Sequence, residues 1–568
     1  MKTENKQPRK RRGTYLNKWS LIAFIIFAGV AIYFSMPSMN VRAIGYWGFM
    51  VLACGIIALV DGLMWGAKLE DDDDAKQPIT FAPALGITAL AIIVLVTGFL
   101  IGLPIFQSRN YANVLGPVTT TEMSEYNISL DDVPMLDSKS AYLLANRKMG
   151  TLVDLVSQFT LDDDVNVQIN YQGRPVRVIP LKYNGIIKWF TNRDQGIPGY
   201  VIVDMQTQSA ELVNVEGGIH YAPKAYFNDD LMRHVYLRHM NEILDGYSFE
   251  LKDDGTPVWL VRAWKKSVGI YNASDLKGIY IVDATTGDIE YYDVGDIPQW
   301  VDTAYPAKTI ITQYDWYGKY QNGWWNSWLG KRGVVETTKG YNYIAYNDDI
   351  YLYTGITSVA SDESNIGFIF TNLRTKETIQ YTYPSAEEYS AMGSAEGQVQ
   401  HLGYQSTFPI MVRVAGVPTY CMALKDDAGL IKLYAMVNAE QYQVVATAAT
   451  VEQTIIEYAS ALDQYNIWHE PVGVVDPEPI TNPDPIEYDY YEGTVTYINN
   501  AIMDGYSYYY VMLDETNDAI FEIKVEGDSK AILFVEVGDY IKLACEQGDL
   551  MNKMVIPATY TNEDWIMD

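Results

Sequence analysis

The string "GIYIVDATTGDIEYYDVGDIPQWVD" occupies residues 278–302 and has a counterpart nearer the N-terminus. "GYVIVDMQTQSAEL" (199–212) aligns with its first half without gaps, so that Asp204 matches Asp283. An acidic Asp-Ala-Thr-Thr-Gly-Asp loop is what a catalytic or metal-binding site can look like, but the apolar residues alternate around a Thr-Gly turn, which is β-hairpin patterning. In the earlier copy Gln208 and Ser209 replace the second Gly and Asp, while the strand pattern stays. The repeated feature is therefore a strand–turn–strand frame, and we interpret the acids as turn residues.

The hairpin is the last part of a longer repeated order. "YQGRPVRVIPL" (171–181) and "DDGTPVWLVRA" (253–263) share a G-x-P turn, in which Gly supplies a positive φ and Pro a fixed one. Before each lies a stretch with helical spacing of apolar residues, at 138–159 and 228–249. Because the order helix, strand, turn, strand and hairpin recurs, the sequence predicts an α+β unit present at least twice.

Two weaker copies follow. "GFIFTNLRTKETIQY" (367–381) matches the hairpin with Asn372 in the place of Asp283, and "AGVPTYCMAL" (415–424) restores the G-x-P piece. Helix-like stretches precede both. We therefore expect four tandem units.

The first two units, residues 138–302, resemble PepSY-type domains of the bacterial cell envelope, which pair a helix with an antiparallel sheet. "VDATTGDIE" fits the hairpin with which those domains often end, and "VDMQTQSAEL" fits it loosely. The resemblance implies protease inhibition, or envelope binding and sensing, without enzymatic activity or a cofactor. The long loops, the apolar N-terminus and the C-terminal domain depart from the PepSY pattern.

The N-terminus predicts three membrane spans. A basic tail with seven Lys/Arg and one acid within residues 1–19 is followed by apolar stretches at 20–36, 43–65 and 81–106. Each is near the ~20 residues that cross a bilayer, and the basic tail is expected to stay in the cytoplasm. Three crossings place everything after about residue 107 outside. Asp61 lies in the second span, and since no other ionisable residue of the spans can pair with it, we expect it to reach the interface near the helix end.

The C-terminal part predicts a separate β-domain. A helix at 450–468 opens with a capping box, Thr450 and Gln453, and a linker rich in Pro and acids follows it. Residues 491–562 alternate apolar and polar side chains in about five short runs, which suits an OB-like barrel. Lys524, Lys530, Lys542 and Lys553 sit among more acids, so no basic groove for nucleic acid is expected.

Composition and motifs argue against several functions. A net charge of −30 repels nucleic acid and anionic lipid from the bulk of the protein. Of the three cysteines, Cys421 and Cys545 are the one pair that a disulfide could join outside the apolar N-terminus. His234 and His239 are spaced wrongly for a zinc-protease helix, and no nucleophile elbow or phosphate loop occurs. We expect no catalytic residue, no cofactor and no metal.

The most unusual stretch is "DWYGKYQNGWWNSWLGK" (315–331). Aromatic side chains stack on sugars and anchor protein interfaces, so Trp316, Tyr317, Tyr320 and Trp325 form a candidate binding surface. Core packing is the alternative, and it explains Trp324 and Trp328 most readily because they lie four residues apart on a helix.

The predicted fold is α+β, with three N-terminal transmembrane helices, tandem PepSY-like repeats and a C-terminal OB-like β-barrel. The expected parts are a basic cytoplasmic tail (1–18), three transmembrane helices (19–106), α+β units at 120–215, 216–302, 303–383 and 384–468 (the last with a trailing helix), a Pro/acidic linker (469–490) and the barrel (491–562).

These features predict a non-enzymatic, membrane-anchored extracytoplasmic protein that presents its modules to a protein or cell-wall partner. A protease-regulating or hydrolytic envelope enzyme, with Asp283 or Glu290 acting in a cleft, is one alternative. A subunit of a membrane transport or assembly complex is the other.

Overall fold

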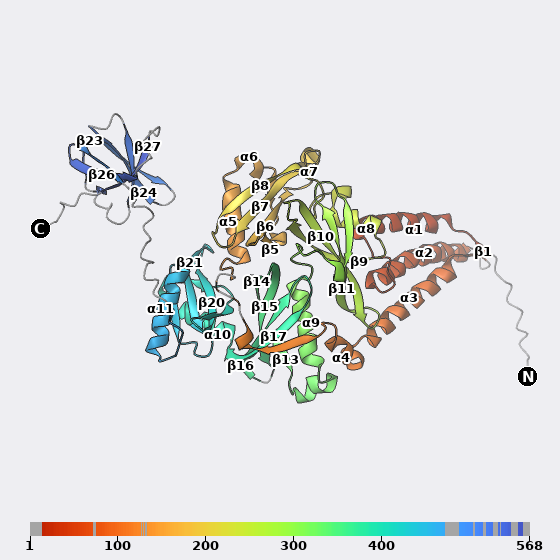
Figure 1. Cartoon of the computed structure of the whole chain (residues 1–568). Coiled ribbons are helices and arrows are strands. Elements are labelled where there is room, and N and C mark those ends of the chain that lie inside the picture. Colours follow the sequence, from red (N-terminus) through yellow and green to blue (C-terminus); the bar gives the residue numbers. More distant parts are fainter. Residues whose placement is uncertain are drawn as a thin grey trace, which may run out of the picture. The chain divides into compact units, whose positions relative to one another are not determined.

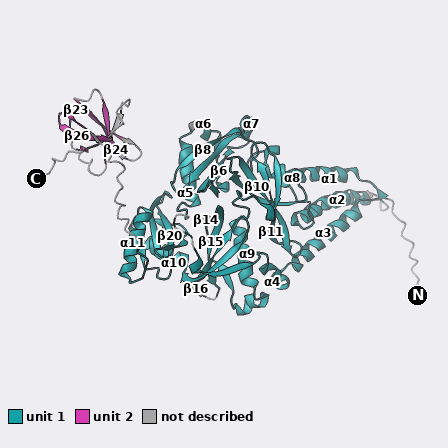
Figure 2. Ribbon diagram, in the orientation of Figure 1, with its two compact units in different colours: residues 1–472 teal, residues 473–568 magenta. Residues whose placement is uncertain are grey.

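The computed structural model describes residues 14–71, 75–126, 128, 130, 133–359, 361–471, 488–503, 506–514, 519–525, 532–533, 535–546 and 555–560. The chain divides into two compact units, residues 1–472 and 473–568 (Figure 2). Most of the predicted basic tail and Pro/acidic linker lies outside the described residues.

Three apolar helices at the N-terminus have the length of membrane spans, as predicted. They are α1 (Lys18–Val30) with a π-helical extension (Ala31–Ser35), α2 (Ile44–Asp71) and α3 (Phe81–Ile101). They lie side by side and project from one side of the compact unit formed by residues 1–472 (Figure 1). Phe27 of α1 stacks on Phe49 of α2 at 6.1 Å between ring centroids, and Trp65 of α2 packs on Phe81 of α3 at 5.6 Å. A short parallel pair, β1 (Thr14–Tyr15) and β2 (Gln77–Pro78), joins the ends of the bundle.

Four sheets follow along the chain, coloured from yellow to cyan in Figure 1. The first has the order β4-β6-β7-β8, with β5 paired to β6: β4 (Phe159–Leu161), β5 (Val167–Tyr171), β6 (Arg174–Tyr183), β7 (Ile197–Asp204) and β8 (Ala210–Ile219). The second has the order β12-β11-β10-β9: β9 (Ile243–Leu251), β10 (Pro257–Val268), β11 (Asn272–Asp283) and β12 (Ile289–Asp293).

The third sheet has the order β13-β15-β16-β17-β3, with β14 paired to β15: β13 (Val335–Thr337), β14 (Asn342–Tyr346), β15 (Asp349–Ser358), β16 (Ser361–Asn372), β17 (Thr378–Ala386) and β3 (Val118–Glu122). The fourth has the order β18-β20-β21-β22, with β19 paired to β20: β18 (Gln405–Ser406), β19 (Ile410–Val414), β20 (Val417–Lys425), β21 (Ile431–Asn438) and β22 (Val445–Ala448).

Helices lie before or beside each sheet: α4 (Pro104–Ala112), α5 (Ser138–Gly150), α6 (Val153–Val156), α7 (Ile186–Asn192), α8 (Leu231–Arg238), α9 (Ala307–Tyr320), α10 (Glu388–Gln398) and α11 (Val451–Gln464). At the start of α11 the Thr450 side chain accepts the Gln453 N–H at 3.2 Å, which is the predicted N-cap. Asp137 caps α5 and Asp230 caps α8 in the same way.

Two sequence predictions about the units were wrong in detail. The helix expected over 228–249 ends at Arg238, because His239 leaves the helical region and residues from Ile243 onward pair with β10 as a strand. The start of the expected first unit at residue 120 falls in β3, which instead lies parallel to β17 at the edge of the third sheet. Both errors concern pairing with a distant strand, which local periodicity does not reveal.

One hydrogen-bond pattern recurs at the hairpin of every sheet. The pattern begins at Asp204, where the side-chain oxygen accepts the N–H groups of Gln206 and Thr207 at 2.9 and 2.8 Å. The next N–H, that of Met205, donates to the carbonyl of Pro175 at 3.1 Å. The same two features occur at Asp283 with Pro257, at Asn372 with Ile350 and at Asn438 with Pro418.

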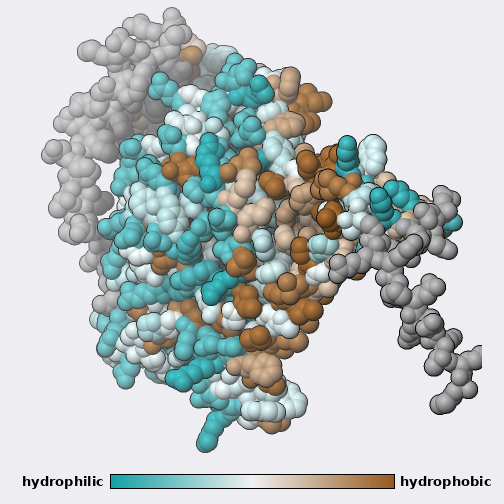
Figure 3. Space-filling view, turned by 90° about the vertical axis from the view of Figure 1, so that its right-hand side faces the viewer, coloured by the Kyte–Doolittle hydropathy of each residue, from teal (hydrophilic) through white to brown (hydrophobic). Residues whose placement is uncertain are grey.

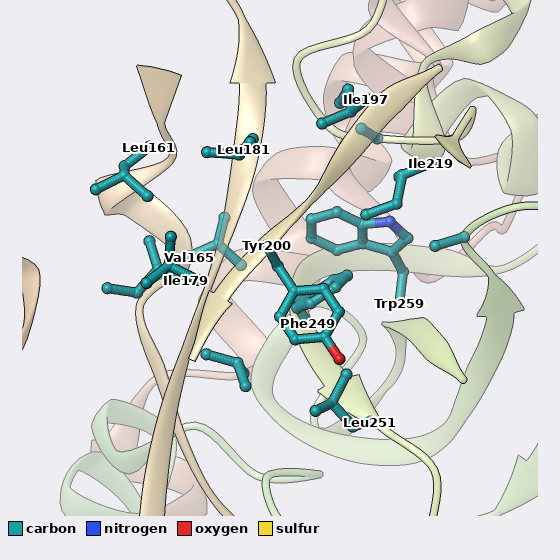
Figure 4. Packing of buried hydrophobic residues seen from close by; sticks show 14 of the residues in the cluster. Leu161, Val165, Ile179, Leu181, Ile197, Tyr200, Ile219, Phe249, Leu251 and Trp259 are labelled. Carbon is teal, nitrogen blue, oxygen red and sulfur yellow. The ribbon is translucent and has the colours of Figure 1, made fainter. Parts of the chain in front are cut away.

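The four sheets share their hydrophobic cores with their neighbours. In the first core Tyr200 of β7 packs on Phe249 of β9, whose ring lies 4.9 Å from that of Trp259 on β10 (Figure 4). Successive side chains of a strand point to opposite faces, so Val258 and Leu260 of the same strand enter a different core with the third sheet. The third and fourth sheets share another core around Tyr353 and Tyr420. Because β10 is buried on both faces, it packs against both the first and the third sheet, and all four sheets belong to the compact unit of residues 1–472.

The second unit holds five strands: β23 (Tyr488–Met503), β24 (Tyr506–Leu513), β25 (Ile520–Lys524), β26 (Tyr540–Glu546) and β27 (Val555–Tyr560). Their pairing runs β23-β24-β25-β27-β26 and returns to β23, because the long β23 pairs with both β24 and β26. Val495, Phe521 and Ile541 are among the buried residues inside this ring.

Candidate functional site

The predicted aromatic surface is divided between the core and the exterior. Trp316 and Tyr320 lie four residues apart on α9, and both turn toward α4, where the Tyr111 ring lies 5.0 Å from Trp316 and 5.9 Å from Tyr320. Tyr317 packs against the cluster that holds Tyr314. These three residues therefore hold α9 in place, and of the four predicted residues Trp325 alone is strongly exposed.

Trp325 belongs to an exposed aromatic tip after α9. The helix α9 ends at Tyr320, and the chain then turns at Gly323, which has a positive φ of 84°. A π-helical turn follows (Asn326–Gly330). Trp325, Trp328 and Leu329 are 62, 63 and 69% exposed, and we call these three residues the aromatic tip. The spacing of Trp328 from Trp324 favours a place in the core, but Trp328 lies in the π-helical turn and is exposed. Its ring stacks on that of Trp324, with 6.0 Å between the ring centroids.

The tip lies on the part of the body that follows the third span. The helix α4 begins directly after α3, and α9 packs on α4 through Tyr111. Phe106 of α4 is also strongly exposed. Viewed from the side that carries the spans, hydrophobic residues gather where the spans emerge from the body (Figure 3). Exposed apolar side chains therefore occur on the body next to the spans as well as on the spans themselves.

The first two spans are joined to α8, and to the segment between α8 and the second sheet, by direct contacts. In the connection between α1 and α2, the Met39 N–H donates to Met240 O at 2.7 Å, and Pro37 O accepts the Tyr236 hydroxyl at 2.9 Å. Arg233 of α8 donates to Tyr33 O at 2.9 Å and lies 4.6 Å from the Tyr33 ring. These contacts fix the body on the first two spans.

The third span meets the same sheet through glycines. A Cβ added to Gly269, in the turn between β10 and β11, would stand 2.8 Å from the Gly102 Cα at the end of α3. A Cβ on Gly98 would stand 2.3 Å from the ring of Tyr271. The backbone of the turn and the end of the span therefore approach each other more closely than side chains would permit.

Asp61 lies beside the residues that begin α1 and α3, at one end of the helix bundle. It is fully buried between the helices, where it accepts Asn17 Nδ2 at 2.8 Å and the Thr80 hydroxyl at 2.5 Å. Asn17 and Thr80 are uncharged, so a pairing of charges alone does not predict them as partners. Asp61 joins the N-terminal ends of α1 and α3 to the middle span.

The acids considered for catalysis have structural partners. Asp283 Oδ1 accepts the N–H groups of Thr285 and Thr286 at 2.8 Å each, and Glu290 accepts the Tyr292 hydroxyl at 2.9 Å. His234 contacts the carbonyl of Gly287 in the same hairpin at 2.7 Å. These groups are therefore engaged in holding the turn. The three cysteines are buried, and Cys54 and Cys421 are free thiols.

A polar cavity lies where the four sheets meet, and no sequence motif pointed to it. Two hollows of about 290 and 330 Å³ share the lining residues Asn166, Tyr341 and Tyr343, and we call them together the junction cavity. The first sheet and its loops contribute Gln168 and Arg177, the second Ser248 and Arg262, and the third Tyr341 and Tyr343, while Thr407 and Phe408 precede β19 of the fourth.

Arg177 is 4% exposed and faces the cavity, and no ion pair joins it to a carboxylate of the described residues. Its Nη1 donates to the backbone and side-chain oxygens of Asn166 at 3.2 and 3.3 Å, and its Nη2 to Gln168 Oε1 at 3.4 Å. Its Nε has no partner among the described residues, and the same holds for Nε2 of the buried Gln168. Burial lowers the pKa of Arg177, since desolvation opposes the charged form.

Arg262 is held more completely. Its Nε donates to Ala304 O at 2.8 Å, and its Nη2 donates to Ser248 Oγ and Thr303 O at 2.9 and 2.7 Å. The buried Glu250 accepts the N–H groups of Asp302 and Thr303 at 2.9 and 3.0 Å. Burial lowers the pKa of Arg262 to about 10, so it remains a cation at neutral pH, and burial raises the pKa of Glu250.

The cavity was missed because a single arginine within a strand carries no recognisable spacing, and its neighbours come from four distant stretches of chain. A scan with protein-family models and a search of curated proteins both found no match to this sequence.

Proposed function

We propose that this chain is a membrane-anchored, extracytoplasmic binding protein without catalytic activity, which presents four related α+β modules to a protein or cell-wall partner. The observation that carries the proposal is that all three parts of the membrane anchor contact the second sheet or the helix before it: Tyr33 meets Arg233 of α8, Met39 meets Met240, and Gly102 meets the β10–β11 turn. A body held in this way keeps a constant orientation at the membrane surface.

The extracytoplasmic side is supported by charge. The basic residues of the N-terminal tail favour its retention in the cytoplasm, and together with three candidate spans this supports an acidic body on the opposite side. A strongly negative body also avoids adsorption to anionic lipid, so that binding depends on specific contacts.

The modular character is supported by the four hairpins. Asp204, Asp283, Asn372 and Asn438 close their turns with the same hydrogen bonds, and we interpret the four sheets as PepSY-like copies of one module. The acids of these turns stabilise the backbone, which favours a binding role over hydrolysis at Asp283. The ring of β23–β27 is interpreted as an OB-like barrel at the C-terminal end.

The aromatic tip is the surface proposed to meet the partner. Large aromatic side chains dominate the energy of protein interfaces, and two tryptophans that are more than half exposed at one turn are costly to leave in water. The test is photo-crosslinking in intact membranes from a photoreactive residue placed at position 325 or 328 of the full-length protein. Position 442, an exposed tyrosine on the fourth unit, is the control.

A discrete adduct from the tip positions and none from position 442 is expected. The double variant Trp325→Ala, Trp328→Ala should lose co-purification of the captured partner while keeping the melting temperature of the wild type, because neither ring is buried. Equal adducts from all three positions, or none from the tip, would contradict the proposal.

A further inference from the structure

The geometry points to the junction cavity as a binding site for a small ligand that carries an oxyanion, a carboxylate or a phosphate, with Arg177 as the residue that recognises it. This inference rests on the proposed binding function and names the chemical class of ligand that one site of the body would take. The argument begins with a comparison of the four units.

The residue type of Arg177 differs from those at the equivalent positions of the other three α+β units. Each hairpin places the N–H after its Asp or Asn against the carbonyl of Pro175, Pro257, Ile350 or Pro418. Two residues beyond each of these anchors, a buried side chain points into the body. In the second, third and fourth units the side chain is Trp259, Leu352 or Tyr420, each within a hydrophobic core. The first unit alone has a cation at this place.

This cation is buried and has no carboxylate in contact with it among the described residues, while Asp137, which lines the same hollow, acts on its charge from beyond contact distance. A buried charge is costly unless it is paired, and no described carboxylate lies within 4.0 Å of the Arg177 guanidinium. Its Nε–H and the Nε2 group of Gln168 are unused donors among the described residues. Both groups could donate hydrogen bonds to an oxyanion.

The charges around the cavity also favour an anion. Two carboxylates line it, and each has its own lysine: Asp137 lies 2.6 Å from Lys425, and Asp164 lies 3.2 Å from Lys224. Three cations line it as well: Arg177 and Arg262 are buried, and Lys308 is exposed. The buried Glu250 attracts Arg262, so Arg177 is the buried cation of the cavity that an anion would complement.

The remaining lining sets the size and character of the ligand. Tyr247, Tyr305, Tyr341 and Tyr343 line the hollows, and their rings and hydroxyls suit a polar organic body attached to the anionic group. The hollows of about 290 and 330 Å³ would hold a metabolite-sized molecule or the end of an anionic polymer chain.

Arg177→Leu is the decisive variant, because the third unit carries Leu352 at the same place. The full-length protein in detergent is titrated calorimetrically with inorganic phosphate and with succinate, and melting is recorded with and without each. Wild type should bind at least one of these anions, and the leucine variant should lose roughly tenfold or more in affinity. Without anion the variant should melt at or above the wild-type temperature, since a buried cation has been removed.

Two further variants complete the test. Arg177→Lys, which keeps the charge but not the planar fork, should bind with intermediate affinity. Arg413→Leu, an exposed arginine on β19, should bind like the wild type and so controls for general salt effects.

A structural role for Arg177 predicts the opposite results. The leucine variant would then melt well below the wild type, and the anions would affect both proteins equally. The inference would also be overturned if the wild type bound neither phosphate nor succinate. The crosslinking at the aromatic tip does not depend on Arg177. A negative anion titration therefore leaves the proposed function intact. A negative crosslinking result leaves the anion site to be decided by the titration.

Discussion

The carboxylates of Asp204 and Asp283 occupy the same place in two hairpins, where each accepts the N–H groups two and three residues further along the chain. In the third and fourth hairpins an asparagine does the same through its side-chain oxygen. What the four turns require is therefore a short side chain with an acceptor oxygen, and the negative charge is dispensable.

This equivalence gives a first prediction. Asp283→Asn should change the free energy of unfolding by less than about 0.5 kcal/mol, because Asn372 and Asn438 fill the role naturally. Asp283→Ala should cost about 1–2 kcal/mol, since two backbone donors lose their acceptor. Denaturant titration of the purified protein measures both values. A loss of similar size in both variants would mean that the charge itself is needed.

The sequence predicted most of the architecture but little of the site. The three spans and the paired Asp204 and Asp283 hairpins followed from local pattern, because apolar length and two-residue alternation are visible within a short window. The parallel pairing of β3 with β17 did not, since a strand carries no mark of its partner. Arg177 and Trp328 were missed for a related reason: burial and exposure at those places depend on neighbours that arrive from elsewhere in the chain.

A second prediction concerns pH. Glu388 is fully buried in α10, and burial raises its pKa to about 7 although Asn365 Nδ2 donates to it at 2.8 Å. The folded state then holds the proton more tightly than the unfolded state, whose pKa is near the ordinary 4.5. Stability from this group is fully present below pH 4.5 and is lost as pH rises to 7, by on the order of 3 kcal/mol.

Glu388→Gln should flatten that fall, which a series of denaturant titrations between pH 4.5 and 7 would show. Asp426→Asn is a control of opposite sign. The Leu430 N–H donates to Asp426 at 2.9 Å and lowers its pKa, so its contribution is lost only in more acidic solution. An unchanged slope in the glutamine variant would rule out Glu388 as the source.

The contact between the third span and the body gives a third prediction. Gly269→Ala should destabilise the protein by about 1–3 kcal/mol and open the segment after α3 to protease, because the new Cβ meets the backbone of Gly102. Gly403→Ala is the matched control. Gly403 has a left-handed backbone with φ 69°, close to the 58° of Gly269, but its Cβ would meet nothing within 4 Å. Equal losses in the two variants would attribute the effect to backbone strain and remove the evidence for close seating.

A fourth prediction concerns the spans. Asp61→Ala leaves Asn17 and Thr80 without their shared acceptor, so the protein should lose about 1–2 kcal/mol of stability in detergent. Asp61→Asn keeps an acceptor oxygen and should retain most of it. Thermal melting in a mild detergent compares the two. If the alanine variant melts with the wild type, Asp61 does not hold the helices together.

The side of the membrane on which the body lies is most directly measured by thiol labelling of intact cells. All three native cysteines are buried, so the wild type gives a low background. Asp194→Cys places a thiol on the body at a side chain that is 95% exposed, and Thr3→Cys places one in the basic tail. A membrane-impermeant maleimide should label the first in intact cells and the second only after permeabilisation. Labelling of the tail in intact cells, with the body protected, would contradict an extracytoplasmic binding protein.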